Sequence, residues 1–193
     1  MMTLSEPSCR AVLITGAARR IGRALAEDFG RRGWQVGLHY RSSADEAAQV
    51  AAAIRASGGK ASLFQADLAD ADACAALMEE AFATLPGLCC LINNASRFEH
   101  DTALDFTTEG WAAHLDVNLR APALLARDFA GQCPPERQGV IINIIDQRVW
   151  KLTPDFFSYT LSKAGLWTMT RTLAQALAPS IRVNAIGPGP TLA

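Results

Sequence analysis

The sequence predicts an α/β protein in which a doubly wound parallel sheet lies between two layers of helices. Short apolar runs alternate with longer amphipathic stretches along the chain, which is the pattern of repeated βαβ units. No tandem repeat, linker or low-complexity block interrupts this alternation. Because half of the 193 residues are hydrophobic, the chain is long enough for one well-buried core. We therefore expect a single domain over residues 1–193.

Six apolar runs are the predicted strands, and they are residues 11–15, 35–40, 61–65, 88–93, 140–145 and 181–186. Apolar residues at helical spacing, such as Ile21, Leu25 and Phe29, predict helices between them. Further helices are expected over residues 71–84, 109–131 and 156–178. Ser43 and Glu46 predict a capping box at the start of the second helix.

The composition argues against a macromolecular or membrane partner. A formal net charge of -1 gives no positive excess that would attract nucleic acid or anionic lipid, so a small-molecule partner is expected. An odd number of cysteines without Cys-x-x-Cys spacing suits neither a disulfide framework nor a zinc or other metal site. Residues 1–10 are polar, and no apolar run is long enough to cross a bilayer. These features favour a cytoplasmic protein.

A glycine-containing turn directly follows the first predicted strand and leads into a helix. It reads Thr15-Gly16-Ala17-Ala18-Arg19-Arg20-Ile21-Gly22. Gly16 permits a tight turn, Gly22 permits close packing of the helix, and the helix N-terminus favours a pyrophosphate. Because the spacing differs from Gly-x-Gly-x-x-Gly, this turn alone is equally compatible with a purely structural role.

The end of the second strand indicates which dinucleotide is bound. An NAD enzyme places a carboxylate there for the ribose hydroxyl, whereas this chain has Tyr40-Arg41-Ser42-Ser43. Arg41, the two serines and Arg20 can together hold a ribose 2′-phosphate, since a guanidinium suits it in charge and geometry. The sequence thus favours NADP(H) over NAD(H); the alternative is that Arg41 is only a solvated charge.

Tyr159 and Lys163 lie one turn apart on the same face of the last predicted helix. An ammonium beside a phenol stabilises the phenolate, so we expect a lowered pKa for Tyr159 and a better acid near neutral pH. Such pairs also occur by chance on helices. Here the pair follows a glycine turn, a strand and a loop in order.

These motifs resemble those of the short-chain dehydrogenase/reductase family, from about residue 12 to the end of the chain. The matching segments are 15–22, Asn93-Asn94-Ala95, Asn118, 159–163 and Pro188-Gly189. The resemblance implies a Rossmann-type fold, a homo-oligomer (dimer or tetramer), Tyr159 as proton donor or acceptor, and Lys163 on the nicotinamide ribose. It implies a cofactor groove, with Asp67 and Leu68 at the adenine, formed by Gly16, Arg19, Arg20, Ile21, Gly22, Tyr40, Arg41, Ser42, Ser43, Asp67, Leu68, Asn93, Ala95, Tyr159, Lys163, Pro188 and Gly189.

Asn118 is implied by the same resemblance to support a proton-relay water. Pro122, four residues later, has no N–H for the Asn118 carbonyl, which leaves that carbonyl open to an ordered water. A buried asparagine in a kinked helix is the alternative interpretation.

Two positions depart from most of the family. Asp146 stands where a serine usually holds the substrate carbonyl, and Arg19 stands where a glycine is usual. Together with segments 38–42 and 94–98, these features resemble the pteridine reductase and dihydromonapterin reductase branch, which has a basic residue at the position of Arg20. This resemblance implies that Phe98 stacks on a pterin ring, with Ser96 and Arg20 on its polar edge. Otherwise Phe98 is a hydrophobic loop residue.

Asp146 must act differently from a serine, because an ionised carboxylate cannot donate a proton. Either burial keeps it protonated, or it orients Tyr159 and a water and accepts hydrogen bonds from an N–H of the substrate. Both roles favour reduction of a ring C=N bond over reduction of a simple ketone.

The sequence thus favours an NADPH-dependent oxidoreductase that reduces a dihydropterin, with Tyr159, Lys163, Asp146 and Asn118 as catalytic residues. The alternatives are an NADPH-dependent reductase of ketones or 3-oxoacyl thioesters, and a noncatalytic NADP-binding protein. The last alternative arises because the family usually continues beyond residue 193 into a substrate lid and a last strand, and a site without its lid admits water.

Overall fold

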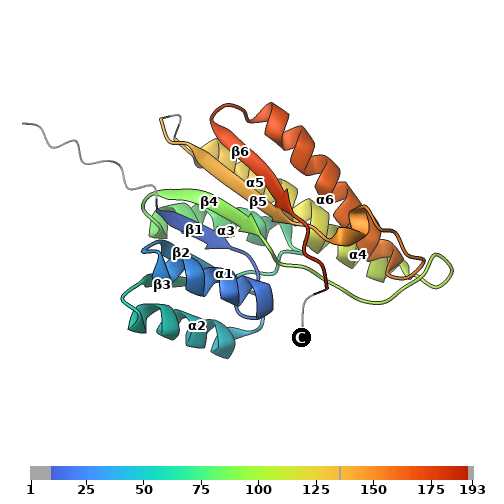
Figure 1. The fold of residues 1–193 in the computed structure, drawn as a ribbon, viewed down its shortest axis with the longest axis horizontal. Helices are drawn as coiled ribbons and strands as arrows, with labels where there is room; N and C mark the ends of the chain where they lie inside the picture. Colours follow the sequence, from blue (N-terminus) through green and yellow to red (C-terminus); the bar gives the residue numbers. More distant parts are fainter. Residues whose placement is uncertain (1–9, 135, 191–193) are drawn as a thin grey trace, which may run out of the picture.

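The computed structural model describes residues 10–134 and 136–190 and contains a six-stranded sheet (Figure 1). The strands are β1 (Ala11–Ile14), β2 (Gln35–Tyr40), β3 (Lys60–Gln65), β4 (Leu88–Asn93), β5 (Gly139–Ile144) and β6 (Ile181–Ile186). They lie in the order β3-β2-β1-β4-β5-β6, and every neighbouring pair is parallel. The predicted doubly wound sheet is confirmed, and the predicted strand boundaries agree to within one residue at each end.

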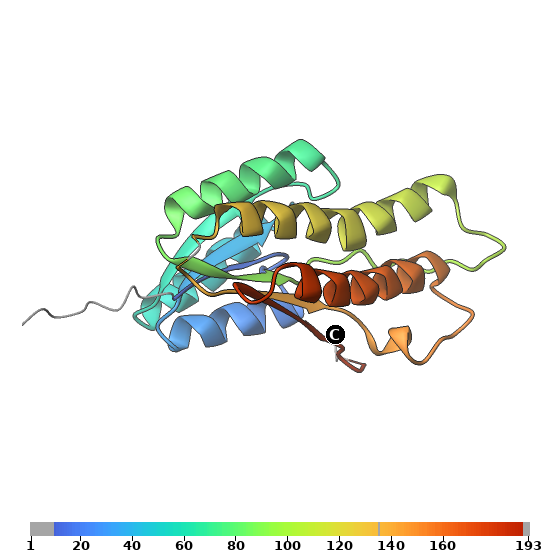
Figure 2. The same cartoon turned by 90° about the horizontal axis from the view of Figure 1, so that it is seen from above.

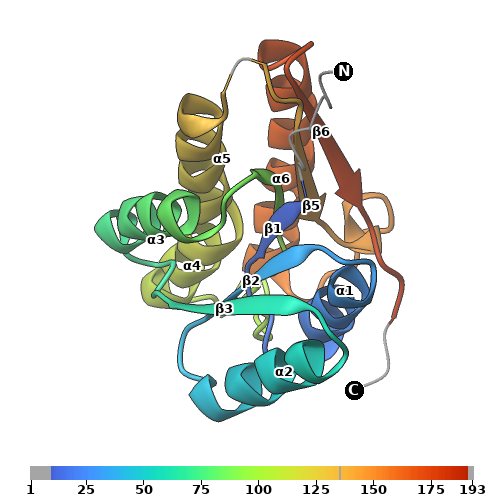
Figure 3. The same cartoon turned by 90° about the vertical axis from the view of Figure 1, so that its left-hand side faces the viewer.

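Helices cover both faces of the sheet (Figures 2 and 3). On one face lie α1 (Arg20–Arg31) and α2 (Ala44–Ala56), and on the other lie α3 (Ala71–Thr84), α4 (Thr108–Leu115), α5 (Ala121–Gln132) and α6 (Phe157–Ala176). A hydrophobic core forms on each side, one around Val36 and Ile54 and the other around Phe64 and Phe129. Because both faces are covered, every residue of β4 is buried.

The strand order reverses between β1 and β4, and this reversal positions the site. The chain proceeds from β1 outward to β3 and then returns to place β4 on the opposite side of β1. The helices that follow β1 and β4 therefore lie on opposite faces of the sheet, which leaves a crevice at the carboxyl ends of the strands.

The predicted helix over residues 109–131 is interrupted by one π-helical turn. This turn, η1 (Asp116–Arg120), joins α4 to α5, and the main-chain N–H of Ala121 donates to the carbonyl of Asp116, five residues back. Pro122 lies in the first turn of α5 and cannot donate to the carbonyl of Asn118. The helix is thus distorted at Asn118 by a π-bulge, a feature found frequently at functional sites.

The expected capping box at the start of α2 is not formed. Ser43 precedes the helix, but its side chain makes no capping hydrogen bond. The carboxylate of Glu46 instead pairs with the guanidinium of Arg19. A charged donor offers the carboxylate a stronger hydrogen bond than a main-chain N–H does, which explains the difference.

Some expectations concern parts of the chain outside the described residues. Residues 1–9, which make up most of the polar N-terminal segment, and residues 191–193 are among these parts. No helix within residues 10–134 and 136–190 is both long enough and apolar enough to cross a membrane.

Candidate active site

A pocket of about 780 Å³ opens at the carboxyl ends of the strands, where loops from both halves of the sheet meet. It brings together most of the residues that the sequence singles out. Those that line it are Gly16, Arg19, Arg20, Ile21, Gly22, Tyr40, Arg41, Ser42, Ser43, Asp67, Leu68, Ala95, Ser96, Phe98, Asp146, Tyr159, Lys163, Pro188 and Gly189. Asn93 and Asn118 do not line it.

The glycine turn has the close approaches that the sequence predicts. Gly16 has a φ of 63°, and a Cβ there would lie 2.9 Å from the Cα of Ala95. At Gly22 a Cβ would lie 2.2 Å from the main-chain oxygen of Gly16 and 2.6 Å from Nδ2 of Asn94. The helix thus packs on the turn itself and on the loop after β4. Arg19, at the position where a glycine is usual, has extended backbone with a φ of -141°, which any residue adopts.

Asn94, rather than Asn93, holds the glycine turn. Its Nδ2 donates to the main-chain oxygens of Thr15 (2.8 Å) and Gly16 (3.0 Å). In return, the hydroxyl of Thr15 accepts from the main-chain nitrogens of Asn94 and Ala95, both at 2.9 Å. These bonds fix the loops after β1 and β4 to each other, although the sequence analysis gave Asn94 no separate role.

The expectation that Asn93 lines the cofactor groove is wrong. Its side chain is buried and donates from Nδ2 to Oδ1 of Asn143 at 2.8 Å. Asn93 and Asn143 are register partners on β4 and β5, so their side chains share one face of the sheet. Asn94 follows the strand and is free to turn toward the pocket.

His39, at the end of β2, is a supporting residue that the sequence analysis missed. Its Nδ1 accepts from the main-chain N–H of Gly16 (3.1 Å), and its Nε2 bonds to the main-chain oxygen of Ala66 (3.1 Å). Burial lowers the pKa of His39 to about 4, so the ring is neutral near pH 7. Only the neutral ring can accept from Gly16, so burial preserves this contact.

Basic residues gather at the end of the pocket near β2. Arg41 follows the strand and is exposed, whereas Arg20 begins α1 with a φ of 51°, in the left-handed region that disfavours a side chain. Arg19 also faces the pocket while its guanidinium pairs with Glu46. Three arginines thus line the pocket that includes the N-terminus of α1, an arrangement that suits an anion.

Asp146 and Tyr159 form the polar centre of the pocket. The hydroxyl of Tyr159 donates to Oδ2 of Asp146 at 2.9 Å, and the main-chain N–H of Arg148 donates to Oδ1 at 2.8 Å. Both carboxylate oxygens therefore accept hydrogen bonds. Of the two roles considered for Asp146, this arrangement corresponds to a carboxylate that orients Tyr159.

The expected lowering of the Tyr159 pKa is wrong. Burial raises this pKa, and the charge of Asp146 and the hydrogen bond to it raise it further, while Arg148 and Ser96 lower it. Removing the Tyr159 proton would place a second negative charge beside a carboxylate, which explains the direction. Tyr159 is consequently held as a protonated phenol.

Lys163 lies beneath Tyr159 and is almost completely buried. Its Nζ donates to the main-chain oxygen of Ile144 (2.8 Å) and lies 5.8 Å from the centre of the Tyr159 ring. Burial lowers the pKa of Lys163 to about 8, and the nearby Asp146 opposes that shift. At neutral pH the ammonium therefore retains its charge below the phenol.

Asn118 supports a loop of the site from behind. Its Oδ1 accepts from the main-chain nitrogen of Arg97 (2.8 Å), and its Nδ2 donates to the main-chain oxygen of Arg97 (2.9 Å) and to Oγ of Ser162 (3.0 Å). The side chain thereby holds the segment between Ser96 and Phe98 in place. A relay water on the main-chain carbonyl of Asn118 stays a prediction.

Phe98 belongs to an aromatic cluster at the mouth of the pocket. Its ring stacks on Phe156, with centroids 4.3 Å apart and planes 7° apart, and meets Tyr159 edge-on at 4.7 Å. Half of its surface is exposed (51%). The pocket also includes Arg97, Glu99, Gln147 and Arg148, which the sequence analysis did not name as site residues because their neighbours become known only in three dimensions.

The fold and the site define an oxidoreductase of the dinucleotide-binding α/β class. The chain matches the short chain dehydrogenase family over residues 10–193, and it belongs to that family.

Individual relatives carry different substrate names. The structure of FolM alternative dihydrofolate reductase 1 from Brucella suis, in complex with NADP, has a TM-score of 0.91 and 48% identity, covering 95% of this chain and 76% of that one. The probable galactose dehydrogenase GalD of Rhizobium meliloti (strain 1021) is 35% identical over 182 residues, which is 93% of this chain and 71% of that protein. The 3-oxoacyl-[acyl-carrier-protein] reductase FabG of Staphylococcus aureus (strain Mu50 / ATCC 700699) is 31% identical over 181 residues, covering 93% and 74%.

Proposed function

We propose that the protein is an NADPH-dependent reductase of a dihydropterin. The observation that carries this proposal is the hydrogen bond from Tyr159 to Asp146 in a pocket that Phe98 also lines. A carboxylate beside the proton donor suits a heterocycle with N–H groups, and an aromatic ring suits its flat face. The similarity to a protein named alternative dihydrofolate reductase, at 48% identity, supports the same substrate class.

The pocket residues fit NADP(H). At Gly16 and Gly22 a Cβ would collide with neighbouring atoms, so the main chain is bare where a pyrophosphate approaches the N-terminus of α1. Arg41, Ser42 and Ser43 supply a guanidinium and hydroxyls for a 2′-phosphate, and no carboxylate stands at those positions. Asp67 and Leu68 would hold the adenine, and Lys163 and Tyr159 would hold the nicotinamide ribose; all four line the pocket. When bound, NADPH supplies a hydride.

The reaction adds a hydride and a proton across one C=N bond. In a 7,8-dihydropterin that bond joins N5 and C6, so C6 receives the hydride and N5 receives the proton. Tyr159 gives its proton to N5, and the cationic Lys163 beneath it stabilises the phenolate that forms. When the hydroxyl of Tyr159 turns from Asp146 to N5, the carboxylate of Asp146 loses that hydrogen bond. It can then accept one from an N–H of the substrate. A proton from solvent then restores the phenol.

Reduction of a ketone or a 3-oxoacyl thioester is the second candidate, because the relatives named GalD and FabG belong to the same family. The geometry of the site weighs against it. A ketone oxygen accepts hydrogen bonds and offers none to Asp146, while the Tyr159 hydroxyl already donates to that carboxylate.

The test is to follow NADPH absorbance with the purified protein and a panel of 7,8-dihydropterins, a simple ketone and a 3-oxoacyl thioester, with NADH as the cofactor control. The proposal requires oxidation of NADPH with the pterins and little oxidation of NADH. Turnover of the ketone or the thioester alone would support reduction of a carbonyl compound instead. Tight NADPH binding without any turnover would indicate a noncatalytic protein. The cytoplasmic location and the oligomeric state stay predictions from the sequence.

A further inference from the structure

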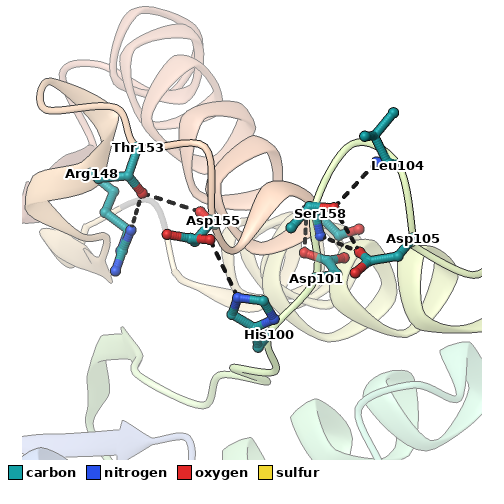
Figure 4. Close-up of polar contacts among 9 residues, drawn as sticks. His100, Asp101, Leu104, Asp105, Arg148, Thr153, Asp155 and Ser158 are labelled. Atoms are coloured by element: carbon teal, nitrogen blue, oxygen red, sulfur yellow. Dashed lines mark hydrogen bonds and ion pairs between the residues drawn. The ribbon is translucent and has the colours of Figure 1, made fainter.

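Arg148 lines the pocket next to the aromatic cluster, and two contacts fix its guanidinium. The central carbon of the group lies 4.7 Å from the centre of the Phe156 ring. One nitrogen, Nη1, donates to the hydroxyl of Thr153, and that hydroxyl donates to the main-chain oxygen of Asp155 at 3.2 Å (Figure 4). A guanidinium held on its face and at one nitrogen keeps its other donors in a fixed direction.

The acidic groups on this side of the pocket have other partners. Glu99 pairs with Arg97 at 2.8 Å, and the carboxylate of Asp155 faces His100 at 3.4 Å (Figure 4). Arg148 itself makes no ion pair with any residue in 10–134 or 136–190, and its Nη2 and Nε form no hydrogen bond within those ranges. A half-buried positive charge with unused in-plane donors is suited to an anion.

We propose that Arg148 binds a carboxylate on the side chain of the pterin substrate. This inference rests on the proposed dihydropterin reduction and specifies which pterins the site prefers. The side chain of a 7,8-dihydropterin is attached to C6, one of the two atoms of the bond that is reduced. It therefore leaves the ring close to Tyr159 and must pass out through the mouth of the pocket.

Contacts within the aromatic cluster connect Tyr159 to Arg148. The ring of Phe98 lies 4.7 Å from that of Tyr159 and 4.3 Å from that of Phe156, and the guanidinium of Arg148 lies over Phe156. Aromatic rings suit a flat group in the side chain, and the guanidinium over Phe156 suits a carboxylate. A side chain that carries an aromatic amide followed by carboxylates, as in 7,8-dihydrofolate, matches this order of contacts.

The experiment compares two substrates that differ in their side chains: 7,8-dihydrofolate, which carries carboxylates, and 6-hydroxymethyl-7,8-dihydropterin, which carries none. In Arg148→Met, kcat/KM for dihydrofolate should fall by about 10- to 100-fold through KM, because a charge-assisted hydrogen bond is lost. The effect of Arg148 on the pKa of Tyr159 is common to both substrates, so the ratio of the two kcat/KM values, dihydrofolate to the hydroxymethyl compound, should fall by about 10- to 100-fold. Arg148→Lys keeps the positive charge but lacks the paired donors of a guanidinium, so an intermediate fall in kcat/KM for dihydrofolate is expected. Arg171→Met is the matched control, since Arg171 lies over Trp167 at 6.0 Å and does not line the pocket.

Thr153→Val gives a second test that leaves Arg148 in place. Thr153 is a positioning residue, so its loss should raise KM for dihydrofolate several-fold without changing kcat for either substrate. An unchanged ratio of the two kcat/KM values in Arg148→Met would overturn the inference while leaving pterin reduction intact. If the wild type reduces neither substrate, the proposed function fails and this inference fails with it.

Discussion

The main-chain N–H of Gly16 donates to Nδ1 of His39 across 3.1 Å, which ties the glycine turn to the end of β2. This bond exists only while the ring is neutral, because a protonated Nδ1 has no lone pair to offer. The pKa of His39 is lowered from 6.5 to about 4 by burial. Protonation of this one ring therefore connects pH to the stability of the turn.

We predict that His39 makes the protein less stable as the pH falls. Since the pKa is lower in the folded state, the unfolded chain binds more protons between pH 6.5 and about 4, and stability is lost as the pH falls through that window. From about pH 7 to about pH 5 the loss should be about 2 kcal/mol. Denaturant unfolding at both pH values measures it, with His39→Gln as the control that should lack this component. Equal losses in both proteins would contradict the assignment.

Replacing Tyr159 by Phe should abolish the reduction but not the binding of NADPH. The phenol is the proton donor of the proposed reaction, and losing such a group costs about 10²- to 10⁴-fold in rate. Turnover and NADPH fluorescence titration on the same preparation separate the two effects. Substantial activity in Tyr159→Phe would assign the proton to another group.

The reduction should slow as the pH rises through the pKa of Lys163, which burial lowers to about 8. Below that pH the ammonium supports formation of the Tyr159 phenolate, and above it the neutral amine does not. The profile of kcat/KM from about pH 6 to about pH 9 tests this expectation. In Lys163→Arg, whose side chain stays charged, the decline near pH 8 should disappear even if the rate is lower. A wild-type profile that is flat across this range would contradict it.

Arg41 should determine the preference for NADPH. In Arg41→Ala the Kd for NADPH should rise about tenfold, because a charged hydrogen bond to the 2′-phosphate is lost, while the Kd for NADH should hardly change. Arg182→Ala, at an exposed position on β6 outside the pocket, is the control. An equal rise in Kd for both cofactors would show that Arg41 does not bind the 2′-phosphate.

The fold could be predicted because it depends on local patterns. Strand runs such as 88–92 are continuous apolar segments, and Gly16 and Gly22 mark a turn whose geometry excludes side chains. The basic segment after β2 was informative because its position in the sequence fixes its position at the sheet edge.

The parts that could not be predicted depend on distant neighbours. The pKa of Tyr159 is set by burial and by Asp146, so the effect expected from Lys163 alone had the wrong direction. Glu46 does not cap α2, because its carboxylate pairs with Arg19, which precedes α1 and is distant in the sequence. Asn93 and Asn94 are adjacent in sequence, yet the strand register sends Asn93 to Asn143 and leaves Asn94 at the pocket.

The most direct test of dihydropterin reduction is a comparison of wild type and Asp146→Ser on a 7,8-dihydropterin and on a simple ketone. Serine restores a hydroxyl donor for a carbonyl and removes the carboxylate that raises the pKa of Tyr159. We predict a fall of at least about tenfold in kcat/KM for the pterin, with unchanged or higher activity on the ketone. Unchanged pterin activity in Asp146→Ser would contradict the role of Asp146 and the substrate class that depends on it.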